Sequence, residues 1–276
     1  MILASASPLT LSLAVGACVA YAASATGAAR ANQTLTRGAI WLAWVLHGLL
    51  LAWGLWGSEP RFGFAPALSV TTWLVGLVYA LESYFYPQLK TPWLLCGAGA
   101  AAVALAMLFP GTPLKLLFPG TALNASASAW LPLHWAFGIA SYGLFAIAVV
   151  HAWLMNRAEA SIRSAADAHT GLPLLTMERL TFRFVSVGFT LLSATLLAGF
   201  FFGTQLYGPT HAIKWDHKTA FSVLSWLAFA ILLIGRARFG WRGRRATRVL
   251  YTGSGLLLLA YVGSRFVMEI LLDRAL

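Results

Sequence analysis

Imidazole side chains that could bind a metal occur at His134, His211 and His217, each beside a long apolar run. His211 and His217 belong to a short polar segment that also contains Trp215 and Asp216. Two axial histidines are one way in which proteins hold haem iron, and rings such as that of Trp215 pack on porphyrin faces. The sequence therefore predicts a non-covalent, b-type haem site with His134 and His217 as iron ligands and His211 as an alternative ligand. The competing interpretation is that the loop histidines are only solvated.

Further candidates lie within apolar runs. Tyr261, Arg265 and Glu269 follow one another at intervals of four, which places them on one face of a helix. Glu269 is the default partner of Arg265, because a guanidinium inside a membrane needs a carboxylate. Alternatively, the guanidinium could grip a haem propionate in bidentate fashion. His47 could be a neutral imidazole bonded to a neighbouring helix, or it could serve a metal, haem or proton.

His134 also heads a stripe of small residues on its own predicted helix. Gly138 and Ser141 follow it at helical spacing, before Phe145. Small side chains allow another helix or a flat ligand to approach closely. The stripe is therefore expected to leave room for a helix or for a flat macrocycle.

Long apolar runs must position these residues. Of the 276 residues, 59 % are hydrophobic and only 10 % are charged, unlike a soluble domain. A run of about 20 apolar residues crosses the hydrocarbon as a helix, because a helix satisfies its own backbone groups. We predict an all-α, polytopic integral membrane helix bundle that forms a single membrane domain over residues 1–276. Its eight predicted spans are 9–28, 38–56, 67–86, 93–109, 131–155, 184–202, 221–234 with its flanks, and 249–272.

Charge and cysteine content exclude several classes of protein. The net charge of +11 resides in short loops beside the spans, so the expected partner is the lipid bilayer with its anionic headgroups, and no nucleic acid. Cys18 and Cys96 lie inside apolar runs and form no Cys-x-x-Cys pair, which argues against covalent c-type haem attachment. No nucleophile, base and orienting group form a recognisable pattern, and we expect no enzymatic activity.

Several short motifs stand out in the second half of the chain. They are Met-Glu-Arg at 177–179, Trp-Asp-His-Lys-Thr at 215–219, Leu-Ser-Trp at 224–226, Gly-Trp-Arg-Gly-Arg at 240–244 and Ala-Tyr-Val-Gly-Ser-Arg-Phe at 260–266. Together they resemble the YpjD and HemX branch of the CcsA-like cytochrome c assembly proteins. The resembling region covers residues 67–272 and is most specific after residue 177.

The resemblance implies a multi-pass protein of the bacterial inner (plasma) membrane that handles haem at the outer face. In the family pattern a histidine opens a helix and Ser-Tyr follows, which His134 and the pair 141–142 match. The family's tryptophan-rich outer segment ends in Trp-Asp-x-Lys, and this chain matches only its end, at 215–218.

The chain departs from full CcsA proteins at two places where they have a histidine. It has Leu-Ile-Gly-Arg at 233–236 and Tyr-Val-Gly at 261–263. The resemblance therefore implies a haem-handling accessory of cytochrome c assembly or haem homeostasis, with cytochrome c maturation proteins as partners. One alternative is a proton-linked transporter that uses His47, Glu82 and Arg265. The other is a regulatory membrane partner of haem biosynthesis that binds no haem.

Orientation is predicted from basic residues, because Lys and Arg accumulate in cytoplasmic loops. Placing 30–37 inside also places 87–92, 156–183 and 236–248 inside, and these segments carry most of the 19 basic residues. Both termini then lie outside. The connection 156–183 is expected to hold a short separate helix followed by a turn. The first positive charge follows the first apolar run, so we predict a retained helix rather than a secretory signal.

We expect reporter fusions at either terminus, and beside His217, to report an outside location. Fusions within 156–183 and 236–248 are expected to report the cytoplasm, because the basic residues concentrate there. A cytoplasmic location of His217 would contradict both the topology and a haem site on the outer face.

Overall fold

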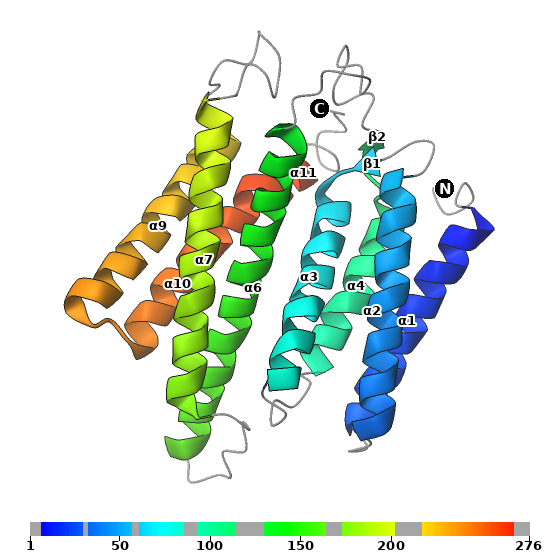
Figure 1. Cartoon of the computed structure of the whole chain (residues 1–276), viewed down its shortest axis with the longest axis horizontal. Helices are drawn as coiled ribbons and strands as arrows, with labels where there is room; N and C mark the ends of the chain where they lie inside the picture. The colour runs from blue at the N-terminus through cyan, green and yellow to red at the C-terminus, as the bar shows by residue number, and fades with distance from the viewer. Residues whose placement is uncertain are drawn as a thin grey trace. The chain divides into compact units, whose positions relative to one another are not determined.

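The computed structural model describes residues 7–29, 33–56, 61–85, 93–113, 130–163, 173–201 and 217–267. Within these stretches the chain is almost entirely helical, as Figure 1 shows. The long helices are α1 (Pro8–Ala29), α2 (Gln33–Trp56), α3 (Phe64–Phe85), α4 (Trp93–Leu108), α6 (Trp130–Arg163), α7 (Leu174–Phe201), α9 (His217–Phe239) and α10 (Gly243–Leu258). A π-helical turn η3 (Leu259–Gly263) and a short helix α11 (Ser264–Phe266) continue α10 without a break. The all-α prediction is confirmed.

Six of the described helices are long and apolar enough to cross a membrane. These spans are Pro8–Gly27, Thr34–Gly54, Phe64–Glu82, Leu133–Ala160, Leu174–Phe201 and His217–Phe239. The other two predicted spans, 93–109 and 249–272, form the helices α4 and α10, which do not meet the length and apolarity of a membrane span. α4 has 16 residues and is about 24 Å long, shorter than the roughly 30 Å of hydrocarbon. α10 begins with three arginines in its first two turns. The prediction of about eight spans is therefore confirmed for six.

The helix α6 is longer than predicted. It runs through Arg163 as one helix, whereas a separate short helix was expected after residue 155. Neither glycine nor proline interrupts 156–163, and Glu159 forms an i, i+4 ion pair with Arg163 at 3.6 Å. These features favour continuation of the helix beyond the apolar run.

The chain divides into two compact units, residues 1–119 with 265–276, and residues 120–264. The prediction of a single membrane domain stays a prediction. In the first unit α1 packs against α2 and α4, and α3 packs against α4 and α2. Its α2–α3 contact is built on two stacked indoles: Trp44 and Trp73 lie 4.7 Å apart and each donates its N–H to the other's backbone carbonyl.

A small two-stranded ribbon, which was not predicted from the sequence, connects the segment before α3 with the segment after α4 in the first unit. The strand β1 (Arg61–Phe62) pairs antiparallel with β2 (Thr112–Pro113). Gly111 precedes β2 with a φ of 79°, which glycine adopts at little cost. A Cβ at this position would lie 2.6 Å from the carbonyl of Phe62. The ribbon therefore depends on this glycine.

The second unit is built around two stacked phenylalanines. Phe145 of α6 and Phe229 of α9 are nearly parallel, at 2°, with ring centroids 3.7 Å apart. Gly188 of α7 faces Phe145, and Gly253 of α10 faces Phe229. A Cβ at Gly253 would lie 2.9 Å from the ring of Phe229. All four helices thus meet at one stack of two rings between two glycines.

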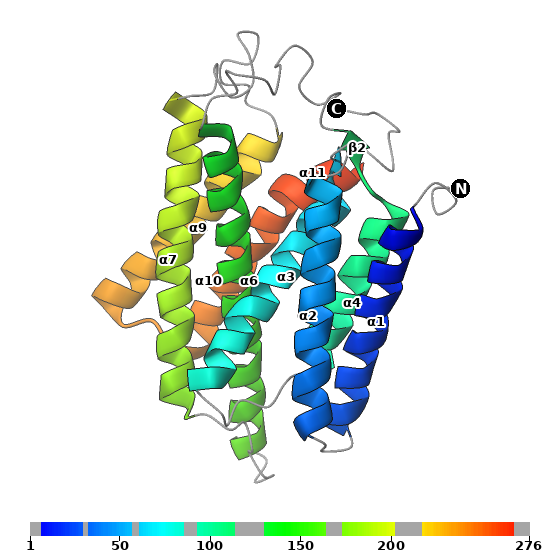
Figure 2. The same cartoon turned by 45° about the vertical axis from the view of Figure 1, so that its right-hand side comes forward.

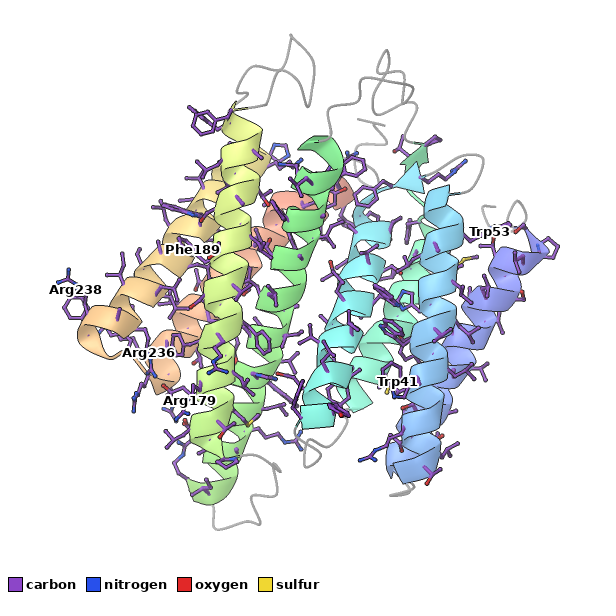
Figure 3. All side chains as sticks on the ribbon, viewed as in Figure 1. Trp41, Trp53, Arg179, Phe189, Arg236 and Arg238 are labelled. Atoms are coloured by element: carbon purple, nitrogen blue, oxygen red, sulfur yellow. The ribbon has the colours of Figure 1, made fainter. Side chains whose placement is uncertain are left out.

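Large apolar side chains are exposed on the outer faces of both units. In the second unit they include Phe200, Ile231 and Ile234, each more than half exposed. In the first unit Trp41 and Trp53 are exposed on α2, and Figure 3 shows Trp53 near the end of the helix and Trp41 farther along it. Apolar exposure on this scale is the pattern of a surface in contact with lipid.

The ring stack leads to a matched pair of substitutions on α10. Gly253→Ala is expected to destabilise the second unit by about 1–3 kcal/mol, because the new methyl group overlaps a ring that cannot retreat. Gly255→Ala is the control: a Cβ there meets no atom within 4 Å, and alanine favours the helix by up to about 1 kcal/mol. Thermal unfolding in detergent measures both. Equal midpoints for the two variants would contradict the stack as a packing constraint.

Candidate functional site

His134 lies near the start of α6, and its ring packs against α7. The ring donates a hydrogen bond to the backbone carbonyl of Thr195, and its Cε1 lies 3.6 Å from where a Cβ would stand at Gly199. In a neutral imidazole one nitrogen carries the proton and the other carries the lone pair. A backbone carbonyl that accepts the ring proton is the usual support of a metal-ligating histidine. His134 thus has one feature of a metal-ligating histidine, while its Nδ1 atom is buried in this structure.

The small-residue stripe below His134 is filled by α7. A Cβ at Gly138 would be 3.6 Å from the methyl group of Thr195, and Gly188 of α7 packs on Phe145. The stripe thus serves helix packing, one of its two expected uses. The expectation that it leaves room for a macrocycle is wrong, because side chains and backbone of α7 occupy that face.

Lys218 and Tyr261 contact each other at the end of the second unit where His134 lies. The ammonium of Lys218 lies 5.5 Å from the centroid of the Tyr261 ring, a cation–π contact. Lys218 also interacts electrostatically with His134. Figure 2 shows that α6 begins, α7 ends and α9 begins at this end of the unit. An imidazole, an ammonium and a phenol from α6, α9 and η3 therefore form one group, which we term the His134 group.

The π-turn that carries Tyr261 is stabilised by Tyr142 of α6. In an α-helix the amide of Tyr261 would donate to the carbonyl of Leu257, but a π-turn shifts its bonds by one residue. The Tyr142 hydroxyl occupies the gap: it donates to the carbonyl of Leu257 and bonds the backbone of Tyr261. A side chain inserted into the helical ladder is a known cause of such distortion. Tyr142 thereby sets the position at which Tyr261 is presented.

The structure describes only part of the predicted polar segment. His217 is the first residue of α9 and is exposed. It precedes Lys218, and adjacent helical residues point about 100° apart, so the two side chains leave α9 in different directions. His211, Trp215 and Asp216 lie outside the described residues, and their roles stay predictions.

Arg265 is half-buried and groups with the first unit, whereas Tyr261 belongs to the second. Its predicted partner Glu269 lies outside the described residues, so both interpretations of Arg265 stay predictions. Across the stretches that the structure describes, no three His, Cys, Asp or Glu side chains gather as a metal site would require.

His47 has the contacts of its structural interpretation. It is fully buried in the first unit, with Nδ1 3.1 Å from the Tyr21 hydroxyl and Nε2 2.7 Å from the Ser69 hydroxyl. Gly99 of α4 leaves space for Tyr21, since a Cβ there would lie 2.5 Å from that ring. Both ring nitrogens of His47 therefore bond neighbouring helices, α1 and α3.

Two members of this site were not recognised from the sequence. In the sequence, Lys218 stands out only as the last residue of a family motif, and Tyr142 only as part of a Ser-Tyr pair. The position of Lys218, one residue into a helix after a polar segment, is a signal that could have identified it. No local signal in the sequence identifies Tyr142, because its partners are more than a hundred residues away.

Comparison with known sequences identifies the family. The pattern of the cytochrome c assembly protein family matches residues 38–272, so the chain belongs to this family. That match includes most of α2 and every later helix that the structure describes. The resemblance found from the sequence motifs is confirmed. No solved structure matches the chain significantly.

Individual relatives agree with this assignment. The inner membrane protein YpjD of Escherichia coli K12 is 29 % identical over 54 % of this chain and 56 % of its own length. An uncharacterized 28.8 kDa protein of Azospirillum brasilense is 35 % identical over 52 % of this chain and 53 % of its own length. The matches thus span about half the length of these relatives. The cytochrome c biogenesis protein CcsA of Prochlorococcus marinus MIT 9515 is 24 % identical over 79 % of this chain and 76 % of its own length.

The predicted localisation as a multi-pass membrane protein is confirmed by the six apolar spans together with these relatives. The Escherichia coli relative, as its name says, is an inner membrane protein.

Removal of the Tyr142 hydroxyl should loosen the π-turn. Tyr142→Phe is expected to cost about 1–3 kcal/mol, because a buried backbone carbonyl loses its donor. Amide hydrogen exchange should become faster around Leu257 and Tyr261. Tyr251→Phe, which removes an exposed hydroxyl bonded to Asn156 at 3.3 Å, is the control and should leave both stability and exchange unchanged. Unchanged exchange in Tyr142→Phe would show that η3 does not depend on this hydroxyl.

Proposed function

We propose that this protein is a haem-handling accessory of cytochrome c assembly or haem homeostasis in a bacterial inner membrane. It binds b-type haem non-covalently at the His134 group. The observation that carries the proposal is an imidazole, supported by a backbone carbonyl, beside an ammonium and a phenol in a cytochrome c assembly family chain. The proposed role is non-enzymatic: the protein would bind haem without converting it.

The chemistry of the three side chains matches the parts of a haem. His134 would be an axial ligand. Its Nδ1 atom is buried in this structure, so a haem would have to displace neighbouring side chains to reach it. Lys218 would bind a propionate through a charge-assisted hydrogen bond. Tyr261 offers a ring face for packing and a hydroxyl for hydrogen bonding. Bound haem supplies an iron centre with two axial positions, and the second ligand is proposed to be His217, with His211 as its alternative.

The packing of α7 limits where a haem can lie. Gly138 of α6 faces Thr195 of α7, and Gly199 of α7 faces the His134 ring. The side of His134 that faces α7 is therefore closed. A macrocycle would therefore approach from the side of Lys218. His217 is the neighbour of Lys218 in the sequence but leaves α9 in another direction, so its side chain would have to turn toward the iron to become the second ligand. Access from a solvated boundary suits a protein that receives and passes on haem, rather than one that buries it permanently.

Haem ligation by His134 is tested with protein purified in mild detergent. The wild type is expected to show a low-spin Soret spectrum, since two imidazoles bind the iron. His134→Ala should lose haem or shift it toward high spin, with the monodisperse fraction of the protein unchanged. His151→Ala is the control on the same helix: it lies 17 residues away, about 25 Å along the axis.

A second substitution separates ligation from folding. Lys218→Gln leaves the imidazole in place and is expected to weaken haem binding while the spin state is kept, because only the propionate contact is lost. Identical spectra and haem loading in wild type and His134→Ala would refute the ligand assignment. A well-folded wild type that takes up no haem would refute the haem proposal and favour the regulatory membrane partner.

A further inference from the structure

The opposite end of the second unit carries a dense group of arginines. Arg236 of α9 contacts Glu178 of α7 at 2.5 Å, and Arg242 contacts the same carboxylate at 3.4 Å. Among the described residues, Glu178 is the carboxylate that contacts these arginines. Further exposed arginines follow close to these residues in the sequence, and Figure 3 shows two of them, Arg179 and Arg238, at this end of α7 and α9. We define the arginine surface as Arg179, Arg238, Arg244, Arg245 and Arg248.

The turn beneath this surface is rigidly built. Gly240 and Gly243 have φ values of 61° and 57°, which favour glycine. Between them, Trp241 donates its amide to the carbonyl of Gly235 at 3.1 Å, and its ring covers that glycine so closely that a Cβ would clash. The guanidinium of Arg245 lies 4.0 Å from the centroid of the Trp241 ring. One arginine is therefore held in place before any ligand arrives, which reduces the entropy lost on binding.

The apolar residues next to the surface indicate its depth in the membrane. Ile231 and Ile234 of α9 are more than half exposed and lie one to two turns before Arg238. Phe239, the last residue of α9, is 73 % exposed. Side chains of this kind belong in lipid or at its boundary. The arginines that follow them along the chain therefore lie at the level of the headgroups.

The exposed arginines of this surface attract anions, and the carboxylate beside them is already engaged. Glu178 is already engaged by Arg236 and Arg242, and neighbouring guanidinium groups repel one another. α10 has no acidic residue in its first turn and no side-chain cap, so its first amides add to the positive field. Guanidinium groups bind phosphate in bidentate fashion.

We propose that the arginine surface binds the phosphate headgroups of anionic phospholipids in the adjoining leaflet. Arg245 on the Trp241 ring, with Arg244 and Arg248 of the same helix, grips the headgroup, while the exposed side chains of Ile234 and Phe239 contact its acyl chains. A lipid is favoured over a soluble acidic partner because the charged surface is continuous with the lipid-facing surface of α9. This site is independent of the proposed haem function.

The test uses the full-length protein in nanodiscs of phosphatidylcholine with increasing phosphatidylglycerol, and lipids retained after gentle release are counted by native mass spectrometry. The wild type is expected to retain phosphatidylglycerol in preference to phosphatidylcholine. Arg244→Gln with Arg248→Gln should weaken this retention about fivefold per arginine removed. Neither residue contacts Glu178, so the ion pairs that hold the turn are kept.

The matched control removes the same charge from another helix. Arg157→Gln with Arg163→Gln affects two exposed arginines near the end of α6 and should leave the retention of phosphatidylglycerol unchanged. Equal losses in both double variants would overturn a defined site, because general charge would then suffice. Release of the lipid by millimolar glycerol phosphate would identify a site for free phosphates instead. Equal retention of the two lipids, or binding of a soluble acidic peptide in place of lipid, would refute the proposal.

Discussion

Inside a membrane, polar groups have no water to bond and must find partners within the protein. This constraint accounts for the most specific contacts of both units. In the first, His47 bonds one hydroxyl with each ring nitrogen. In the second, the Tyr142 hydroxyl fills the gap that a π-turn leaves in the backbone ladder. Each polar side chain thereby links helices that apolar packing alone would not orient.

Apolar packing acts through shape, since lipid chains are as hydrophobic as the side chains they compete with. The helices therefore approach where one offers a ring and the other a glycine. Phe145 against Gly188, Phe229 against Gly253 and the paired indoles of Trp44 and Trp73 follow this rule. Such contacts fix the rotation of each helix. That rotation directs His134 toward Thr195.

The sequence predicts what depends on composition along the chain, namely the long spans and the helical class. It does not predict what depends on which helix faces which. The stripe below His134 could have admitted a ligand, and only the position of α7 shows that a helix fills it. Tyr142 gives no local sign of its role, because Leu257 and Tyr261 become its partners only after folding. The end of α6 was placed too early because apolar length says nothing about a polar helical extension such as 156–163.

The two ends of the second unit differ in the chemistry they offer. Among the described residues, one end presents the imidazole of His134 and the ammonium of Lys218, and the other presents arginines beside a carboxylate, Glu178, that two of them already bind. The arginine end cannot cross the hydrocarbon without losing its hydration, so it holds the unit in one orientation. The His134 group is then kept at the opposite boundary for as long as the unit stays folded. The lipid contact proposed at the arginine end would therefore also set the membrane face at which the proposed haem site lies.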